Sequence, residues 1–202
     1  MSFSTRSRAE YFLALLMALA VLGLSPTPSM AQAREPTVDT TPAKAGPHPL
    51  LPGSRLTGEA LLRYWGLRIY HARLWTLPSV RADQVADNAL VLELEYLREL
   101  KGRAIAERSL AEMQRAGPIS EQQSQQWLAH MQRLFPDVKN GDRLTGQHLP
   151  GQGANFVYNG QPLGRVDDPE FARRFFGIWL APTTSQPDMR TALLGLSPAQ
   201  ER

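Results

Sequence analysis

The sequence contains no cysteine among its 202 residues. Disulfide bonds and metal sites built on thiolates are therefore excluded. Attachment to a membrane through an acylated cysteine is excluded for the same reason. A chain without covalent cross-links has to be stabilised by its hydrophobic core, and roughly 150 residues beyond the N-terminal region are enough for one compact domain.

The sequence also has little excess charge of either sign. Its 22 Lys and Arg and 19 Asp and Glu give a formal net charge of +3. A nucleic-acid-binding domain needs a concentrated basic surface, which this balance does not supply. We therefore expect no nucleic-acid partner.

The motifs of common catalytic and cofactor sites are missing as well. The histidines show neither the HxxxH nor the HExxH spacing of zinc enzymes, and no GxSxG elbow of a serine hydrolase is present. Asp167 and Asp168 precede Pro169, where helix capping explains them better than acid–base chemistry does. We expect no metal and no other cofactor, and the sequence assigns no catalytic residue.

The N-terminal region resembles an export signal. The apolar run 12–24 is too short for a comfortable membrane span and follows a polar start that carries Arg6 and Arg8. Small-residue cleavage sites follow, ending at Ala31 or Ala33. We predict a signal peptide over residues 1–31, with an uncleaved membrane anchor as the alternative.

The segment after the leader is rich in proline and small polar residues and cannot bury much apolar surface. We predict a disordered linker over residues 32–53 and one folded domain over residues 54–197. After cleavage we expect a periplasmic or secreted protein with no stable membrane span.

Alternating apolar and polar residues predict a sheet in the first part of the domain. Residues 56–65 and 67–75 are typical of two strands with Gly66 at the bend between them. In residues 89–98 the apolar side chains occupy every second position. Arg98 continues their inward row, so its side chain points either into a cleft or past the sheet edge.

Apolar residues at helical spacing predict four helices, and a second strand pair lies between them. The helices span residues 101–117, 120–135, 167–180 and 188–196, and the strands span residues 141–151 and 154–166. We place Arg108 and Glu112 on the outer face of the first helix. Asn159-Gly160 supplies a tight two-residue hairpin turn within residues 154–166. The order predicts an α+β fold, an antiparallel sheet with helices packed over one face.

The order and spacing of these segments resemble the bacterial chalcone isomerase-like domain family. The resemblance extends from Leu56 to Leu196 and is carried by the runs at 56–75, 94–113, 135–180 and 188–196. It implies an open-faced β-sandwich whose helices enclose a cleft. Plant chalcone isomerases share this fold with noncatalytic relatives that hold fatty acids, so the fold does not settle the activity.

The resemblance also implies candidate binding residues. It places Tyr70 where the isomerases carry a hydrogen-bonding threonine and the fatty-acid binders carry a tyrosine. The arginine partner falls on Arg63, or on Arg55 if the turn between the strands is longer. An arginine fork and a phenol together satisfy a buried carboxylate. We expect Arg63 and Tyr70, with Arg98 as a further candidate, to bind a fatty acid or similar small amphiphile.

Two other functions stay open at this point. The first is an isomerase or lyase acting on a phenolic or unsaturated carbonyl compound, with Arg63 polarising the oxyanion and Tyr70 donating a proton. The threonine at position 70 and the Tyr and Asn of the isomerase helix are not reproduced, which favours the noncatalytic binder. The second is a structural or partner-binding module, whose protein partners the sequence does not reveal.

Overall fold

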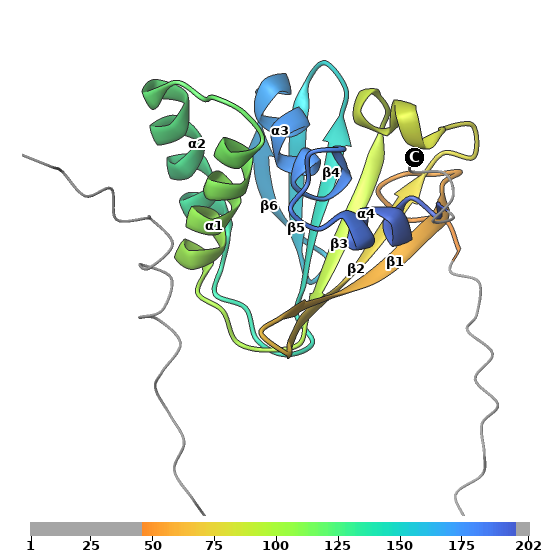
Figure 1. The fold of residues 1–202 in the computed structure, drawn as a ribbon, viewed down its shortest axis with the longest axis horizontal. Helices are drawn as coiled ribbons and strands as arrows, with labels where there is room; N and C mark the ends of the chain where they lie inside the picture. Colours follow the sequence, from red (N-terminus) through yellow and green to blue (C-terminus); the bar gives the residue numbers. More distant parts are fainter. Residues whose placement is uncertain (1–45, 197–202) are drawn as a thin grey trace, which may run out of the picture. The chain divides into compact units, whose positions relative to one another are not determined.

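The computed structural model describes residues 46–196. The predicted signal peptide and most of the predicted linker lie outside the described residues. The described part forms one sheet with helices along the chain (Figure 1). Its elements are β1 (Arg55–Tyr64), β2 (Leu67–Thr76), the 3-10 helix η2 (Ala82–Asp87), β3 (Leu90–Tyr96), α1 (Gly102–Arg115), α2 (Glu121–Leu134), β4 (Arg143–Leu149), β5 (Gly153–Tyr158), β6 (Gln161–Val166), α3 (Pro169–Leu180) and α4 (Pro187–Leu193).

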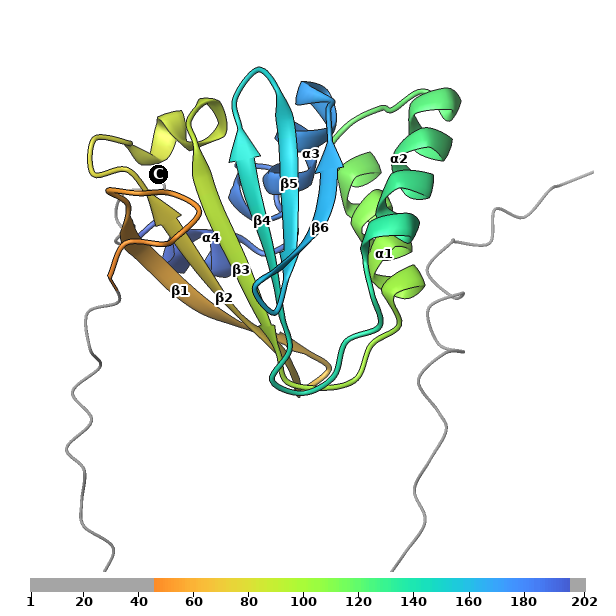
Figure 2. The ribbon, with the colours of Figure 1, turned by 180° about the vertical axis from the view of Figure 1, so that it is seen from behind.

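The sheet is an antiparallel meander of six strands in the order β1-β2-β3-β4-β5-β6 (Figures 1 and 2). The two tightest hairpins turn at Trp65-Gly66 and at Asn159-Gly160, where all four residues have positive φ angles. Such a pair of positive φ angles is the signature of the type I′ turn, whose twist matches that of the flanking strands. Both predicted turns are confirmed.

One face of the sheet carries the core. Cross-strand pairing aligns Leu74, Leu92 and Phe156 in one row, and all three are buried. Helix α3 lies over β4 and β5, and α4 lies over β1, as Figure 1 shows. Helix α1 packs against α2 and α3, while α2 reaches β6. The predicted α+β fold, with helices over one face of an antiparallel sheet, is confirmed.

Local signals fix the ends of the helices. Ser120 caps α2 in the predicted capping box, accepting from the Gln123 backbone N–H at 3.2 Å. Asp168 caps α3 by accepting from the backbone N–H groups of Glu170 and Phe171 at 2.9 and 3.0 Å. The second oxygen of Asp168 accepts from Trp127 Nε1 at 2.8 Å. One carboxylate therefore holds the start of α3 against α2.

Ion pairs between neighbouring strands stabilise the opposite face of the sheet. Arg73 on β2 lies 2.9 Å from Glu95 and 3.3 Å from Glu93 on β3, and 3.7 Å from Glu59 on β1. Arg143 on β4 extends the network to Glu95 at 3.2 Å. The polar positions of the predicted strand 89–98 thus pair with cations from both neighbouring strands.

The same face carries a small apolar cluster under residues 46–53. The Trp75 indole N–H donates to the Gly46 carbonyl at 3.3 Å, and the Gln147 amide donates to the Leu50 carbonyl at 2.6 Å. Leu51 packs with Trp75 and Val91. The last residues of the predicted linker therefore contact the sheet.

Within residues 46–196, no helix has the length and apolar character needed to cross a bilayer.

Helix α4 sits so close to β1 that Gly58 leaves no room for a side chain. A Cβ at this position would lie 2.1 Å from the Ala192 carbonyl oxygen. We predict that Gly58→Ala lowers the free energy of unfolding by about 2 kcal/mol or more, because the helix backbone has to shift. Chemical denaturation measures the change. Gly46→Ala is the control, because nothing lies within 4 Å of its Cβ; equal losses in the two variants would contradict this packing.

Candidate functional site

The candidate site is built around Tyr70, on the helix-covered face of β2. Tyr70 pairs with Leu62 on β1 and with Tyr96 on β3, so the three side chains share one cross-strand row. The residue is half-buried, and its hydroxyl accepts a hydrogen bond from Trp179 Nε1 at 2.9 Å. This bond joins β2 to the last turn of α3.

The burial of α3 explains the need for this bond. Phe171, Phe175, Phe176 and Trp179 are all buried along the helix, as its apolar circumference predicts. A buried indole N–H costs free energy unless it finds an acceptor. The Tyr70 hydroxyl supplies that acceptor inside the apolar layer.

The Tyr70 hydroxyl keeps a proton that it does not donate to any residue between 46 and 196. Burial raises the pKa of Tyr70 to about 12, although the Trp179 hydrogen bond and the charge of Arg108 act in the other direction. The phenol is therefore neutral at physiological pH. It accepts one hydrogen bond and has one donor left for another partner.

Tyr96 forms a second phenol beside the first. Its ring meets that of Tyr70 edge to face, with centroids 5.8 Å apart, and the residue is buried. Burial raises the pKa of Tyr96 as well. Its hydroxyl has no hydrogen-bond partner among the described residues. The row thus contains two neutral phenols, each with donor capacity to spare.

A cluster of charged side chains on α1 interacts electrostatically with Tyr70 in this row. Glu112 is buried and is held by Arg108 and by Arg115 Nε, the latter at 3.0 Å. Burial alone would raise the pKa of the Glu112 carboxyl, but hydrogen bonds from Arg115 and Ser185 and the two arginine charges keep it below its ordinary value. The charges of Arg108 and Glu112 both reach the Tyr70 hydroxyl. The prediction that Glu112 lies on the outer face of its helix was wrong, because α1 turns this side toward the other helices.

The three predicted site residues lie at the same end of the sheet, but among the described residues no hydrogen bond or ion pair joins them. Arg63 is exposed at the end of β1, opposite Arg68 across the hairpin. Arg98 is half-buried in the connection from β3 to α1. Arg55, the alternative to Arg63, opens β1 opposite Thr76. Within residues 46–196, none of these arginines forms a hydrogen bond or an ion pair with Tyr70.

Sequence reasoning missed Trp179, Tyr96 and Arg108 as neighbours of Tyr70. The patterns place Tyr96 in the alternating row of residues 89–98 and Arg108 on the outer face of its helix, and they give none of the three a role in binding. Their apolar surroundings give no local sign of a polar contact. The one usable signal was that a buried Trp or Tyr needs a hydrogen-bond partner.

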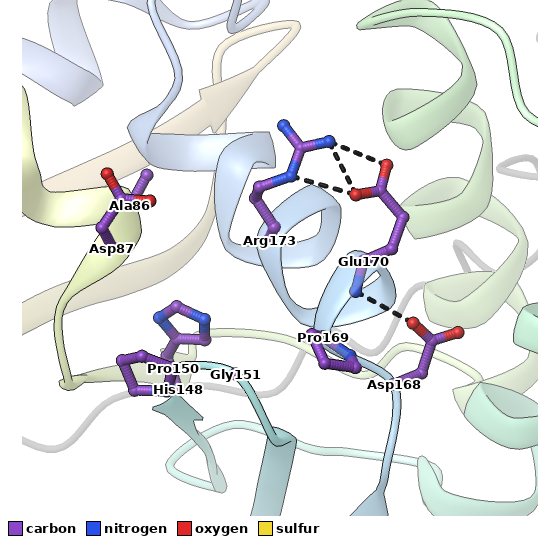
Figure 3. A pocket seen from close by; sticks show the side chains of 9 residues that line it. All are labelled: Ala86, Asp87, His148, Pro150, Gly151, Asp168, Pro169, Glu170 and Arg173. Carbon is purple, nitrogen blue, oxygen red and sulfur yellow. Dashed lines mark hydrogen bonds and ion pairs between the residues drawn. The ribbon is translucent and has the colours of Figure 1, made fainter.

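An open depression of about 550 Å³ lies at another place, between η2, the β4–β5 turn and the start of α3 (Figure 3). It is lined by Ala86, Asp87, His148, Pro150, Gly151, Asp168, Pro169, Glu170 and Arg173. Glu170 pairs with Arg173 at 2.7 Å, and Asp168 is engaged as the cap of α3. The charged side chains that line the depression are thus largely paired with one another or with the backbone. No cluster of metal-binding side chains occurs in the part of the chain that the structure describes.

His148 is the titratable group buried at the edge of this depression. Its Nδ1 lies 3.0 Å from the Asn88 carbonyl oxygen, which fits a neutral ring that donates from Nδ1. Its ring packs on Phe176 with centroids 5.3 Å apart. Burial lowers the pKa of His148, and the Asn88 hydrogen bond and the charge of Asp87 only partly offset this.

The comparisons with known proteins agree with this architecture. Residues 55–195 match the family model described as chalcone isomerase-like, and the chain belongs to that family. A fatty-acid binding protein of Arabidopsis thaliana has a similar fold, with a TM-score of 0.55 and 14% identity, over 76% of this chain and 90% of that one.

A relative in sequence comes from Haemophilus influenzae. An uncharacterized protein of that organism is 32% identical over 112 residues, which are 55% of this chain. The match spans 54% of the relative, about half of its length.

His148 makes stability depend on pH. Its pKa in the folded state lies below the ordinary value of 6.5, so the unfolded chain binds the proton first as the pH falls. The contribution of His148 to the free energy of unfolding is then fully present above about pH 6.5 and is lost as the pH falls below that value. We predict that His148→Asn, which keeps a donor near the Asn88 carbonyl, makes the decline between about pH 6.5 and pH 5 shallower.

Thermal unfolding at a series of pH values measures this effect. His48, whose pKa burial also lowers, contributes to the remaining slope, and His130→Asn, at a half-buried position on α2, is the control. An unchanged profile in His148→Asn would show that this ring is not held neutral.

Proposed function

We propose that this chalcone isomerase-like protein binds a fatty acid or a similar amphiphilic carboxylate without catalysing a reaction on it. The observation that carries the proposal is the Tyr70 hydroxyl, which accepts from Trp179 and keeps its own proton for a further partner. The fatty-acid binding protein of Arabidopsis with the similar fold supports the choice of ligand class. That likeness concerns the fold alone, so the choice rests on the side chains.

The chemistry of the row suits a carboxylate. Two neutral phenols donate hydrogen bonds to an anion, and such charge-assisted bonds are about twice as strong as bonds between neutral groups. The apolar residues around them suit an alkyl chain, because each buried methylene contributes about 0.8 kcal/mol. In this proposal the acid head lies at Tyr70 and Tyr96, and the chain lies along the helix-covered face.

An arginine is needed to offset the charge of the ligand, and two positions compete for that role. Arg63 is the residue predicted from the sequence, seven residues before Tyr70 in the same hairpin. Arg108 is the arginine whose charge reaches the Tyr70 hydroxyl. We propose Arg63 and Arg98 as ligand-binding residues that a side-chain movement brings to the acid, and Arg108 as the competing assignment.

The pKa of Tyr70 argues for binding over catalysis. General acids and bases work best when their pKa lies near the working pH, whereas burial raises that of Tyr70 to about 12. Its hydrogen-bond partner among the described residues is an indole, which cannot relay a proton as an imidazole or carboxylate does. This favours the noncatalytic binder over the isomerase.

We also propose that binding takes place outside the cytoplasm, in the periplasm or after secretion. The support is the predicted signal peptide at residues 1–31, which lies outside the described residues. N-terminal sequencing of the protein recovered from the producing cells tests this point; a chain that still begins at Met1 in the cytoplasmic fraction would contradict it.

Binding of palmitic acid and of methyl palmitate tests the proposal. We predict that Tyr70→Phe weakens binding of the acid by about tenfold, because a hydrogen bond to a charged group is lost, and weakens binding of the ester much less. Isothermal titration calorimetry measures both. Tyr64→Phe removes the same atom from an exposed tyrosine and should change neither.

Arginine variants decide between the two cationic partners. Arg63→Gln should weaken binding of the acid more than binding of the ester if Arg63 reaches the headgroup, and Arg108→Gln should do so if the competing assignment holds. Thermal unfolding of each variant checks that the fold is intact. Equal losses for acid and ester in all these variants would contradict a carboxylate site.

A further inference from the structure

The tip of the β1–β2 hairpin exposes large apolar side chains. Trp65 is 80% exposed, and its neighbours Tyr64 and Leu67 are 39% and 44% exposed. The other large apolar side chains of the described residues are at least partly buried. One solvent-facing leucine needs no explanation, but two aromatic rings and a leucine on a single turn form a local apolar surface.

Trp65 is also an unfavourable residue for the conformation that it adopts. It has a φ of 51° and Gly66 has a φ of 77°. The first position of such a type I′ turn favours Asn, Asp or Gly, because other side chains are disfavoured at positive φ. The β5–β6 hairpin of the same chain follows this rule with Asn159 at 48° and Gly160 at 82°. Folding alone therefore does not account for a tryptophan at position 65.

Positive charge flanks the apolar tip. Arg63 and Arg68 are paired across the hairpin and are both exposed. Arg68 Nη2 lies 3.2 Å from His71 Nε2, and neither arginine forms an ion pair within residues 46–196. No acidic residue occurs from position 63 to position 68. The tip thus combines aromatic rings with two guanidinium groups that have no anionic partner in the described part of the chain.

The tip lies at the end of the sheet away from η2 and the open depression. Figures 1 and 2 show the β1–β2 turn at the lower end of the sheet, beside the β3–α1 and α2–β4 connections, with η2 at the opposite end. A two-residue turn is narrow and convex. It offers far less area than the roughly 1,000 Å² that a stable protein interface buries.

We propose that this hairpin tip, residues 63–68, docks the protein on the surface of a membrane that contains anionic lipids. Trp and Tyr side chains favour the interface between headgroups and acyl chains. The arginine forks bind lipid phosphates, whose charge they complement. A convex tip enters this layer without needing a matching surface, which is why a lipid surface fits better than a folded partner. The inference rests on the exposed turn and not on the Tyr70 hydroxyl; Arg63 belongs to both proposals, so Trp65→Asn and Arg68→Gln test the membrane surface and Tyr70→Phe tests the carboxylate site.

The decisive variant is Trp65→Asn, which places the favoured Asn-Gly pair in the turn. We predict that it raises the unfolding temperature, because the turn conformation becomes favourable. We also predict that it weakens binding to vesicles of phosphatidylglycerol and phosphatidylcholine in equal parts by about tenfold, because the inserted ring is lost. A variant that is more stable yet binds less cannot owe its loss to misfolding.

The charges are tested separately. Arg63→Gln and Arg68→Gln should each weaken binding to these vesicles by about fivefold, with little change on vesicles of phosphatidylcholine alone. Arg81→Gln removes the same charge beside η2 and should have no effect. Added salt should reduce the difference between the two vesicle types.

Co-sedimentation of the full chain with vesicles measures all four variants. The proposal is overturned if the unaltered protein does not sediment with the anionic vesicles, or if Trp65→Asn sediments as well as the unaltered protein does. It is also overturned if these substitutions leave vesicle binding unchanged but abolish binding of a protein partner. Because palmitic acid binding is measured without vesicles, failure of either proposal is recognised independently of the other.

Discussion

The hydrogen bond from Trp179 to Tyr70 is the interaction on which the candidate site depends. Helix α3 covers the centre of the sheet with aromatic side chains, and the indole N–H of Trp179 is buried with them. An unpaired buried donor costs about 1–3 kcal/mol, so an acceptor has to lie within the apolar layer. A phenol satisfies this demand and still has its own proton to donate. The packing of the helix therefore places a neutral donor inside the apolar layer, where the proposed ligand would have its acid group.

The two faces of the sheet are stabilised in different ways, and this leaves the ends of the sheet for other roles. The helix-covered face is mostly apolar, with the two phenols and His148 among its polar groups, whereas the other face carries the Arg73 and Arg143 ion pairs and the packed segment 46–53. The hairpin tip at one end and the open depression at the other are defined by turns and helix ends. Residues in such places contribute less to the core, so their chemistry can follow function.

Much of the fold could be predicted from local patterns. Asn159-Gly160, the capping box at Ser120 and the alternation along residues 89–98 each depend on neighbours close in sequence, and the structure has all three. The site could be predicted only in part. Tyr70 and Trp179 are far apart in sequence, and nothing local shows that they share a hydrogen bond. Glu112 was misplaced because an i,i+4 pair with Arg108 is typical of an exposed helix face, and tertiary packing overrode that pattern.

The central claim is that the Tyr70 hydroxyl is a neutral donor that meets the acid group of a ligand. NMR spectra of protein labelled with ¹³C at the tyrosine ζ carbons test it most directly, with Tyr70→Phe assigning the signal. We expect the Tyr70 signal to show a protonated phenol at neutral pH and to shift when palmitic acid is added, but much less with methyl palmitate. A signal that is unchanged by the acid, or that titrates near pH 10 like an exposed phenol, would contradict the account.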